Sequence, residues 1–113
     1  MSRITLKQGE SRELVLTVTT TGGTIVDLTG ATLLLGVKRR KQDTTYAFSH
    51  THGDFSLTLA TIGVVSVFLT TANTIQYQGD LIGELRIKFA TSPVIVDKSA
   101  DFTISIQEAV IKY

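Results

Sequence analysis

The sequence predicts an all-β fold, an immunoglobulin-like antiparallel β-sandwich of about seven to eight strands. Apolar and polar residues alternate along several short segments, as in strands with one buried face. Threonine, valine, isoleucine and leucine dominate the sequence, and turn residues recur about every 8–12 positions. The chain has no cysteine and no tryptophan, so the sandwich would lack the antibody core signature. A small closed β-barrel is the alternative architecture.

The first two predicted strands lie in residues 8–37, on either side of a Gly22-Gly23 turn. In the first strand, Leu14, Leu16 and Val18 alternate with outward positions. The inward set of the second strand is Ala31, Leu33, Leu35 and Val37. The two glycines are expected to supply the positive φ angles that a tight hairpin turn needs.

The segment at residues 26–31, VDLTGA, is interpreted as a structural entry into the second strand. Leu28 is expected to close the end of the sandwich, and Asp27 and Thr29 to bond nearby backbone amides. Gly30 would allow the sharp turn into the strand. A role of this segment in ligand binding is the alternative.

Alternation returns in four later segments, each with an inward-facing apolar set. These sets are Phe55, Leu57 and Leu59; Val65, Val67 and Leu69; Leu85, Ile87 and Phe89; and Phe102, Ile104 and Ile106. Ser92-Pro93 is expected to end the third, since proline donates no hydrogen bond to a strand ladder. Residues 70–78 are short and rich in threonine, so they predict one helical turn at most.

Four phrases, taken in order, are similar to one protein family. They are KQGE at residues 7–10, VDLTGAT at 26–32, GVVSV at 63–67 with Leu69, and GDLIGELRI at 79–87. Together they resemble the N-terminal immunoglobulin-like domain of phage baseplate upper proteins, which connect receptor-binding proteins to the baseplate. The resemblance covers nearly the whole chain and implies the fold and a phage-particle setting. The segment at residues 39–52 is longer and more charged than a minimal hairpin needs.

Length and charge narrow the class of protein. A chain of 113 residues is expected to form one domain, residues 1–113. The net charge of +1 argues against nucleic acid as a partner, because phosphate contacts require a basic excess. No segment approaches the ~20 apolar residues of a membrane span, so no membrane insertion is expected. The N-terminus has no signal peptide pattern, which predicts synthesis in the host cytoplasm. The resemblance to baseplate upper proteins implies residence in the virion, in its tail or baseplate.

Two polar clusters are candidates for binding chemistry. His50, His52 and Asp54 have the spacing of a zinc site, but no cysteine or further histidine completes the ligand shell. We therefore expect no metal and no cofactor, with solvated histidines in a polar loop.

The second cluster is the basic run Lys38, Arg39, Arg40 and Lys41. It is interpreted as a solvated strand end, with binding of phosphate, lipid headgroups or an acidic partner as the alternative.

Catalysis has little support in the sequence. A nucleophile needs a base within reach and an orienting group, and neither histidine lies in a nucleophile motif. No glycine-rich loop precedes a helix, so no phosphate-binding loop is predicted. We expect a protein that is not an enzyme and has no small-molecule substrate.

Apolar residues in the outward phase of their strands form the candidate interaction surface. Within strands these are Val15, Leu34, Val64, Phe68 and Ile82, and the C-terminal tail adds Val110, Ile111 and Tyr113. The segment at residues 39–52 could instead cover such a patch. The tail could extend the last strand, or it could pair with a neighbouring subunit by strand addition.

These features predict a non-enzymatic structural protein of a phage tail or baseplate, acting as an assembly or adaptor module. Its expected partners are copies of itself, in a homo-oligomer, and other phage tail proteins. The alternative is an immunoglobulin-like adhesin that binds carbohydrate on the host surface. Aromatic platforms would favour the adhesin, and the candidates are Tyr46, Phe48, Phe68 and Tyr77.

Overall fold

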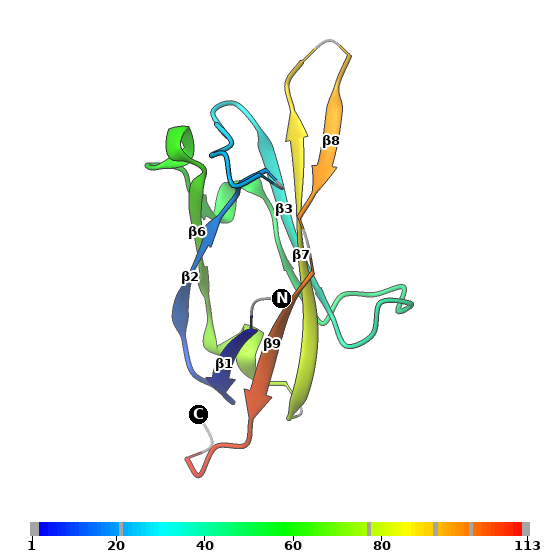
Figure 1. The fold of residues 1–113 in the computed structure, drawn as a ribbon. Helices are drawn as coiled ribbons and strands as arrows, with labels where there is room; N and C mark the ends of the chain where they lie inside the picture. The colour runs from blue at the N-terminus through cyan, green and yellow to red at the C-terminus, as the bar shows by residue number, and fades with distance from the viewer. Residues whose placement is uncertain (1–2, 21, 77, 92, 100, 112–113) are drawn as a thin grey trace.

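Two β-sheets packed face to face form the molecule (Figure 1). The computed structural model describes residues 3–20, 22–76, 78–91, 93–99 and 101–111. The larger sheet contains β1 (Arg3–Lys7), β9 (Phe102–Gln107), β7 (Gly79–Phe89), β3 (Thr32–Lys38), β4 (Phe48–His50) and β8 (Ile95–Lys98). The smaller sheet contains β2 (Arg12–Thr17), β6 (Val64–Leu69) and β5 (Phe55–Ser56).

The strand order confirms the predicted sandwich and excludes the closed barrel. One sheet has the order β1-β9-β7-β3-β4 and the other the order β2-β6-β5. The sheets are therefore separate, as in immunoglobulin domains. The described residues hold nine strands rather than seven to eight, and one pair, β1 with β9, is parallel. β8 extends the sheet along the upper part of β7, on the same edge as β9 (Figure 1).

The core lies between the inward faces of the two sheets and follows the predicted alternation. In β3 and the residue before it, the inward set Ala31, Leu33, Leu35 and Val37 is at most 2% exposed. The facing side chains from the smaller sheet include Leu14, Val65, Val67 and Leu69, all buried. Full burial of one such side chain contributes roughly 1.5–3 kcal/mol, so this layer dominates the stability of the fold.

The entry segment before β3 has the predicted structural form. Leu28 is 1% exposed, and Gly30 has a φ of 78°. The Asp27 Oδ1 atom accepts a hydrogen bond of 2.9 Å from the Thr29 amide. Hydrogen bonds from Thr29 also lower the pKa of the Asp27 carboxyl below its ordinary value. The segment thereby carries the chain from the smaller sheet into the larger one.

The role of the Gly22-Gly23 turn differs from the prediction. The strands that flank it, β2 and β3, lie in different sheets and do not pair. The turn instead closes a small bridge between Thr19 and Ile25, and only Gly23 has a positive φ, of 87°. The chain crosses between sheets after this bridge, which the local alternation could not indicate.

The predicted strand with Phe55, Leu57 and Leu59 on one face is also corrected. Only β5 is strand, and Leu57 and Leu59 are 37% and 51% exposed. The chain turns after Ser56 into the 3-10 helix η2 (Ala60–Ile62), where Ala60 is buried. The backbone oxygen of Ala60 accepts a hydrogen bond from the Leu28 amide, which ties this turn to the core.

Two further short elements connect the strands of the described fold. The 3-10 helix η1 (His52–Asp54) precedes β5, and α1 (Thr71–Thr74) is the single helical turn that the sequence predicts. The Thr70 hydroxyl caps α1 by accepting from the Asn73 amide. The fully buried Thr74 hydroxyl donates to the Glu10 carbonyl oxygen over 2.7 Å, which anchors α1 to the N-terminal segment.

The sequence prediction missed β8. This strand forms a hairpin with the upper part of β7 that projects beyond the sandwich (Figure 1). All four residues of β8 are exposed, so its two faces have the same environment. A strand without a buried face carries no period-two signal, which explains why alternation did not reveal it.

Candidate interaction site

The residues of the predicted interaction surface divide between two opposite faces of the sandwich. Val15 and Phe68 lie on the outer face of the smaller sheet and are 55% and 56% exposed. Val64 lies on the same face and is half-buried. In the β2–β6 register Val15 pairs with Ser66, and Phe68 pairs with Glu13. Directly across the two strands, each of these apolar side chains therefore has a polar neighbour.

Leu34 and Ile82 lie on the outer face of the larger sheet, and both are half-buried. They line a hollow together with Lys41 and Tyr46 from the segment at residues 39–47. Lys41 and Tyr46 of this segment therefore lie around the same hollow as the two apolar residues.

The C-terminal tail does not extend β9 within the described residues. β9 ends at Gln107, and Ala109 packs into the molecule at 8% exposure. Val110 and Ile111 are 97% and 83% exposed. Tyr113 lies outside the described residues.

The β7–β8 hairpin adds an apolar surface that sequence reasoning missed. It carries Val94, Ile95 and Val96, each about half exposed. β8 pairs with β7, and β1 pairs with β9 and does not reach β8. Among the described strands, the outer edge of β8 therefore has no partner. The sequence signal was the consecutive apolar run after Pro93, which has no alternation.

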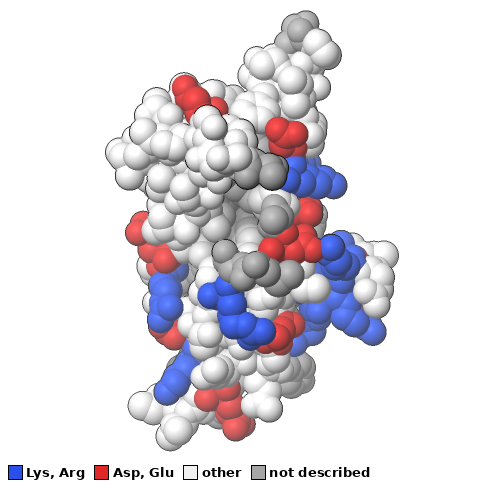
Figure 2. Space-filling model, in the orientation of Figure 1, with Lys and Arg blue, Asp and Glu red and all other residues white. Residues whose placement is uncertain are grey.

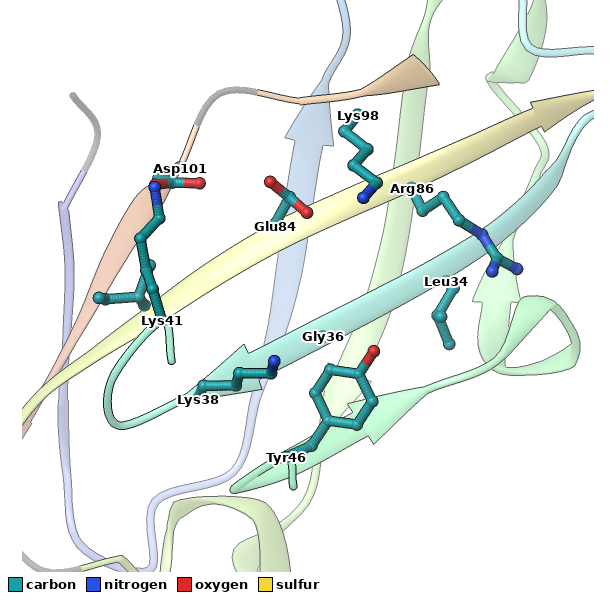
Figure 3. Close-up of a pocket in the computed structure, with 10 residues that line it drawn as sticks. Leu34, Gly36, Lys38, Lys41, Tyr46, Glu84, Arg86, Lys98 and Asp101 are labelled. Atoms are coloured by element: carbon teal, nitrogen blue, oxygen red, sulfur yellow. The ribbon is translucent and has the colours of Figure 1, made fainter. Parts of the chain in front are cut away.

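A hollow of about 290 Å³ lies on the outer face of β3 and β7 (Figure 3). Its apolar part consists of Leu34, Ile82 and the Tyr46 ring. Its charged lining comprises four cations and two carboxylates from three parts of the chain. These are Lys38, Lys41, Arg86 and Lys98, with Glu84 and Asp101.

Gly36 in the middle of β3 makes room for the Tyr46 ring. A Cβ atom at this position would lie 2.5 Å from Tyr46 Cε1. The Lys38 ammonium lies 5.4 Å from the centroid of the same ring, in a cation–π contact. The ring is thereby held between the strand and Lys38, and forms one wall of the hollow (Figure 3).

Most of the predicted basic run has partners within the chain. Lys41 forms an ion pair with Asp101, whose carboxylate raises the pKa of the Lys41 ammonium. Arg40 Nε lies 3.4 Å from Asp43 Oδ1. Blue side chains gather at the right of Figure 2, with red side chains beside them. The run is therefore part of a mixed-charge surface, and its lysines help to build the hollow.

Lys38 has its cation–π contact, but the two other cations of the hollow, Arg86 and Lys98, have no such partner. Arg86 in β7 lies directly opposite Lys98 in β8. In the described part of the chain, neither side chain forms an ion pair. The Nε atom of Arg86 is buried and has no hydrogen-bond acceptor among the described residues. Like charges opposite one another in adjacent strands are destabilising. Arg86 and Lys98 are therefore two neighbouring positive residues without a described carboxylate partner.

The two histidines form structural contacts instead of being solvated. His50 Nδ1 lies 3.0 Å from Asp54 Oδ2, and His50 Nε2 lies 2.8 Å from Asn73 Oδ1. His52 Nδ1 accepts a hydrogen bond of 3.2 Å from the Leu33 amide. Within the described residues, no three side chains of histidine, cysteine, aspartate or glutamate gather as metal ligands.

The aromatic candidates for a carbohydrate platform do not come together. Tyr46 walls the hollow, Phe48 is buried at 9% exposure, and Phe68 lies on the opposite face. Tyr77 is outside the described residues.

No helix in the described ranges has the length and apolar character needed to cross a membrane.

Neither a family model nor a curated protein matches this chain.

Proposed function

We propose that this protein is a non-enzymatic assembly module of a phage tail or baseplate, which binds copies of itself and a neighbouring tail protein. The observation that carries the proposal is the projecting β7–β8 hairpin, with three exposed apolar residues and an open strand edge. The phage setting rests on the resemblance of the four sequence phrases to baseplate upper proteins.

The hairpin has the chemistry of a strand-addition surface. The open edge of β8 presents backbone amide and carbonyl groups that a second strand can pair with. Val94, Ile95 and Val96 add apolar area beside that edge. Exposed edges with apolar side chains promote association, and soluble proteins usually protect them with charge or proline. Pro93 precedes this strand and Lys98 is its last residue, which limits pairing to a short segment.

The body of the sandwich holds the hairpin in place. Ile87, in the part of β7 that pairs with β8, is 3% exposed and belongs to the core. The Ser99 hydroxyl accepts a hydrogen bond of 2.9 Å from the Leu85 amide just beyond β8. A hairpin anchored in this way presents its edge in one orientation, which is what an assembly module requires.

The test is the mass in solution by size-exclusion chromatography with light scattering, over a range of concentrations. We expect the wild type to form a stable oligomer and the double variant Ile95→Thr/Val96→Thr to be monomeric. Threonine keeps the strand preference while removing apolar area. The matched control is Val15→Thr, an exposed valine on the opposite face, which should leave the oligomer unchanged.

Two results would contradict the proposed self-association. One is a wild-type monomer at every concentration. The other is an oligomer that the hairpin variant leaves intact. Circular dichroism on each variant shows whether the fold is retained.

A further inference from the structure

We propose that the hollow on the outer face of β3 and β7 binds a carboxylate side chain of an acidic peptide segment. This names the chemistry of a partner for the assembly role proposed above, and rests on that role. The argument depends on the charge balance of the hollow, on the arrangement of Arg86 and Lys98, and on the neighbouring strand edge.

The lining of the hollow has an excess of positive charge. Lys41 and Asp101 pair with each other. Lys38, Arg86 and Lys98 then remain with Glu84 as the only other carboxylate of the lining. No ion pair within 4.0 Å connects Glu84 to any of the three in the described ranges. An anionic group entering the hollow would therefore meet a net attraction.

Arg86 and Lys98 form the most specific part of this attraction. They are directly opposite in the β7–β8 register, and the Arg86 Nε atom lacks an acceptor among the described residues. A guanidinium presents two parallel N–H groups that match the two oxygens of a carboxylate. A carboxylate bound to the Arg86 guanidinium would neutralise one of these two unpaired cations.

The surroundings favour a peptide carboxylate over a nucleic acid backbone. Glu84 and Asp101 in the same lining would repel a chain of closely spaced phosphates. Lys98 belongs both to the hollow and to β8, whose edge is open. A strand added along β8 places every second side chain on the face that carries Lys98. An acidic residue of such a strand lies beside the hollow.

The experiment measures binding by fluorescence anisotropy of a labelled peptide with alternating valine and glutamate. Wild-type protein should bind it, and should bind the peptide with glutamine in place of glutamate at least about tenfold more weakly, as expected for a lost charge-assisted hydrogen bond. Arg86→Gln should weaken binding of the glutamate peptide by a similar factor. The matched control is Lys7→Gln, which removes one exposed positive charge from β1, outside the hollow.

A second variant tests the hollow without changing its charge. Gly36→Ala would push the Tyr46 ring from its place, so it should reduce affinity for the glutamate peptide while the fold is kept. If Arg86→Gln does not fold, Lys98→Gln in the exposed strand β8 replaces it in the comparison.

Three outcomes would overturn the proposal. They are equal affinity for the glutamate and glutamine peptides, equal loss for Arg86→Gln and Lys7→Gln, and tighter binding of a single-stranded oligonucleotide than of the peptide. A monomeric protein that binds the glutamate peptide as expected would contradict self-association alone. The two proposals can therefore fail separately.

Discussion

Two strands, β8 and β9, pair with the same edge of β7 and have opposite environments. β9 pairs with residues 79–83 and buries Phe102, Ile104 and Ile106 between the sheets. β8 pairs with residues 86–89, and each of its residues is exposed. One long strand, β7, therefore supports the core of the sandwich at one end and carries a fully exposed strand at the other.

The difference arises from what faces each strand across the sandwich. β9 is covered on its outer edge by β1 and on its inner face by the core. β8 extends the sheet beyond the region that these elements cover (Figure 1). Its apolar residues therefore stay exposed and contribute little to folding.

The largest expected effect is at the centre of β9. Ile104 is fully buried, so Ile104→Ala should lower the free energy of unfolding by about 2–5 kcal/mol. Urea denaturation followed by circular dichroism measures this change. A loss below about 1 kcal/mol would mean that β9 is not part of the stabilising core.

Gly83→Ala should come next, because the added Cβ atom would lie 2.5 Å from the buried Phe102 ring. We expect a loss of about 1–3 kcal/mol by overpacking. Gly36→Ala is the matched control, with the same 2.5 Å approach to the exposed Tyr46 ring. That ring can move into solvent, so the control should cost less than about 1 kcal/mol. Equal losses in the two variants would show that burial of the ring does not decide the cost.

The hairpin variant Ile95→Thr/Val96→Thr should change the free energy of unfolding by only about 0.5 kcal/mol or less, when measured on monomeric protein. Both side chains are already about half exposed, and threonine suits a strand. The measurement is the urea midpoint at a concentration where wild type and variant have the same mass. A loss as large as that of Ile104→Ala would place β8 in the folding unit and remove the contrast with β9.

The smallest expected effect concerns pH at the β1 end of the larger sheet. Arg3 hydrogen-bonds the Asp80 carboxylate and lowers its pKa below the ordinary value of 3.8. This carboxylate therefore stabilises the folded state fully above about pH 4, and the stabilisation is lost as pH falls through its lowered pKa. The difference in urea midpoint between wild type and Asp80→Asn should be small at neutral pH and vanish in acid. A difference that grows in acid would contradict this assignment.

Some elements were predictable because burial leaves a pattern in the sequence. The inward phase of β3, β6, β7 and β9 follows from alternation, since one face of each is buried. The VDLTGA entry was predictable from the ordinary local bonding of aspartate, threonine and glycine. β8 and the exposed Leu57 and Leu59 were not, because neither segment buries one face regularly.

For the candidate interaction residues too, the sequence predicted one property and missed another. Val15 and Phe68 were correctly placed in the outward phase of their strands, and are exposed. Their distance in the fold from Leu34 and Ile82 depends on which sheet each strand joins. Residues of one phase in different strands can lie on opposite faces of the molecule.

The sequence by itself determined that this chain forms an all-β sandwich, and which side chains of its regular strands point inward. These properties depend on the period-two geometry of a strand, which acts over neighbouring residues. Only the tertiary structure decided which strands share a sheet, which edge stays open, and how Arg86 and Lys98 come to face each other. Those features depend on pairing between residues distant along the chain, and no local pattern records the partner of a strand.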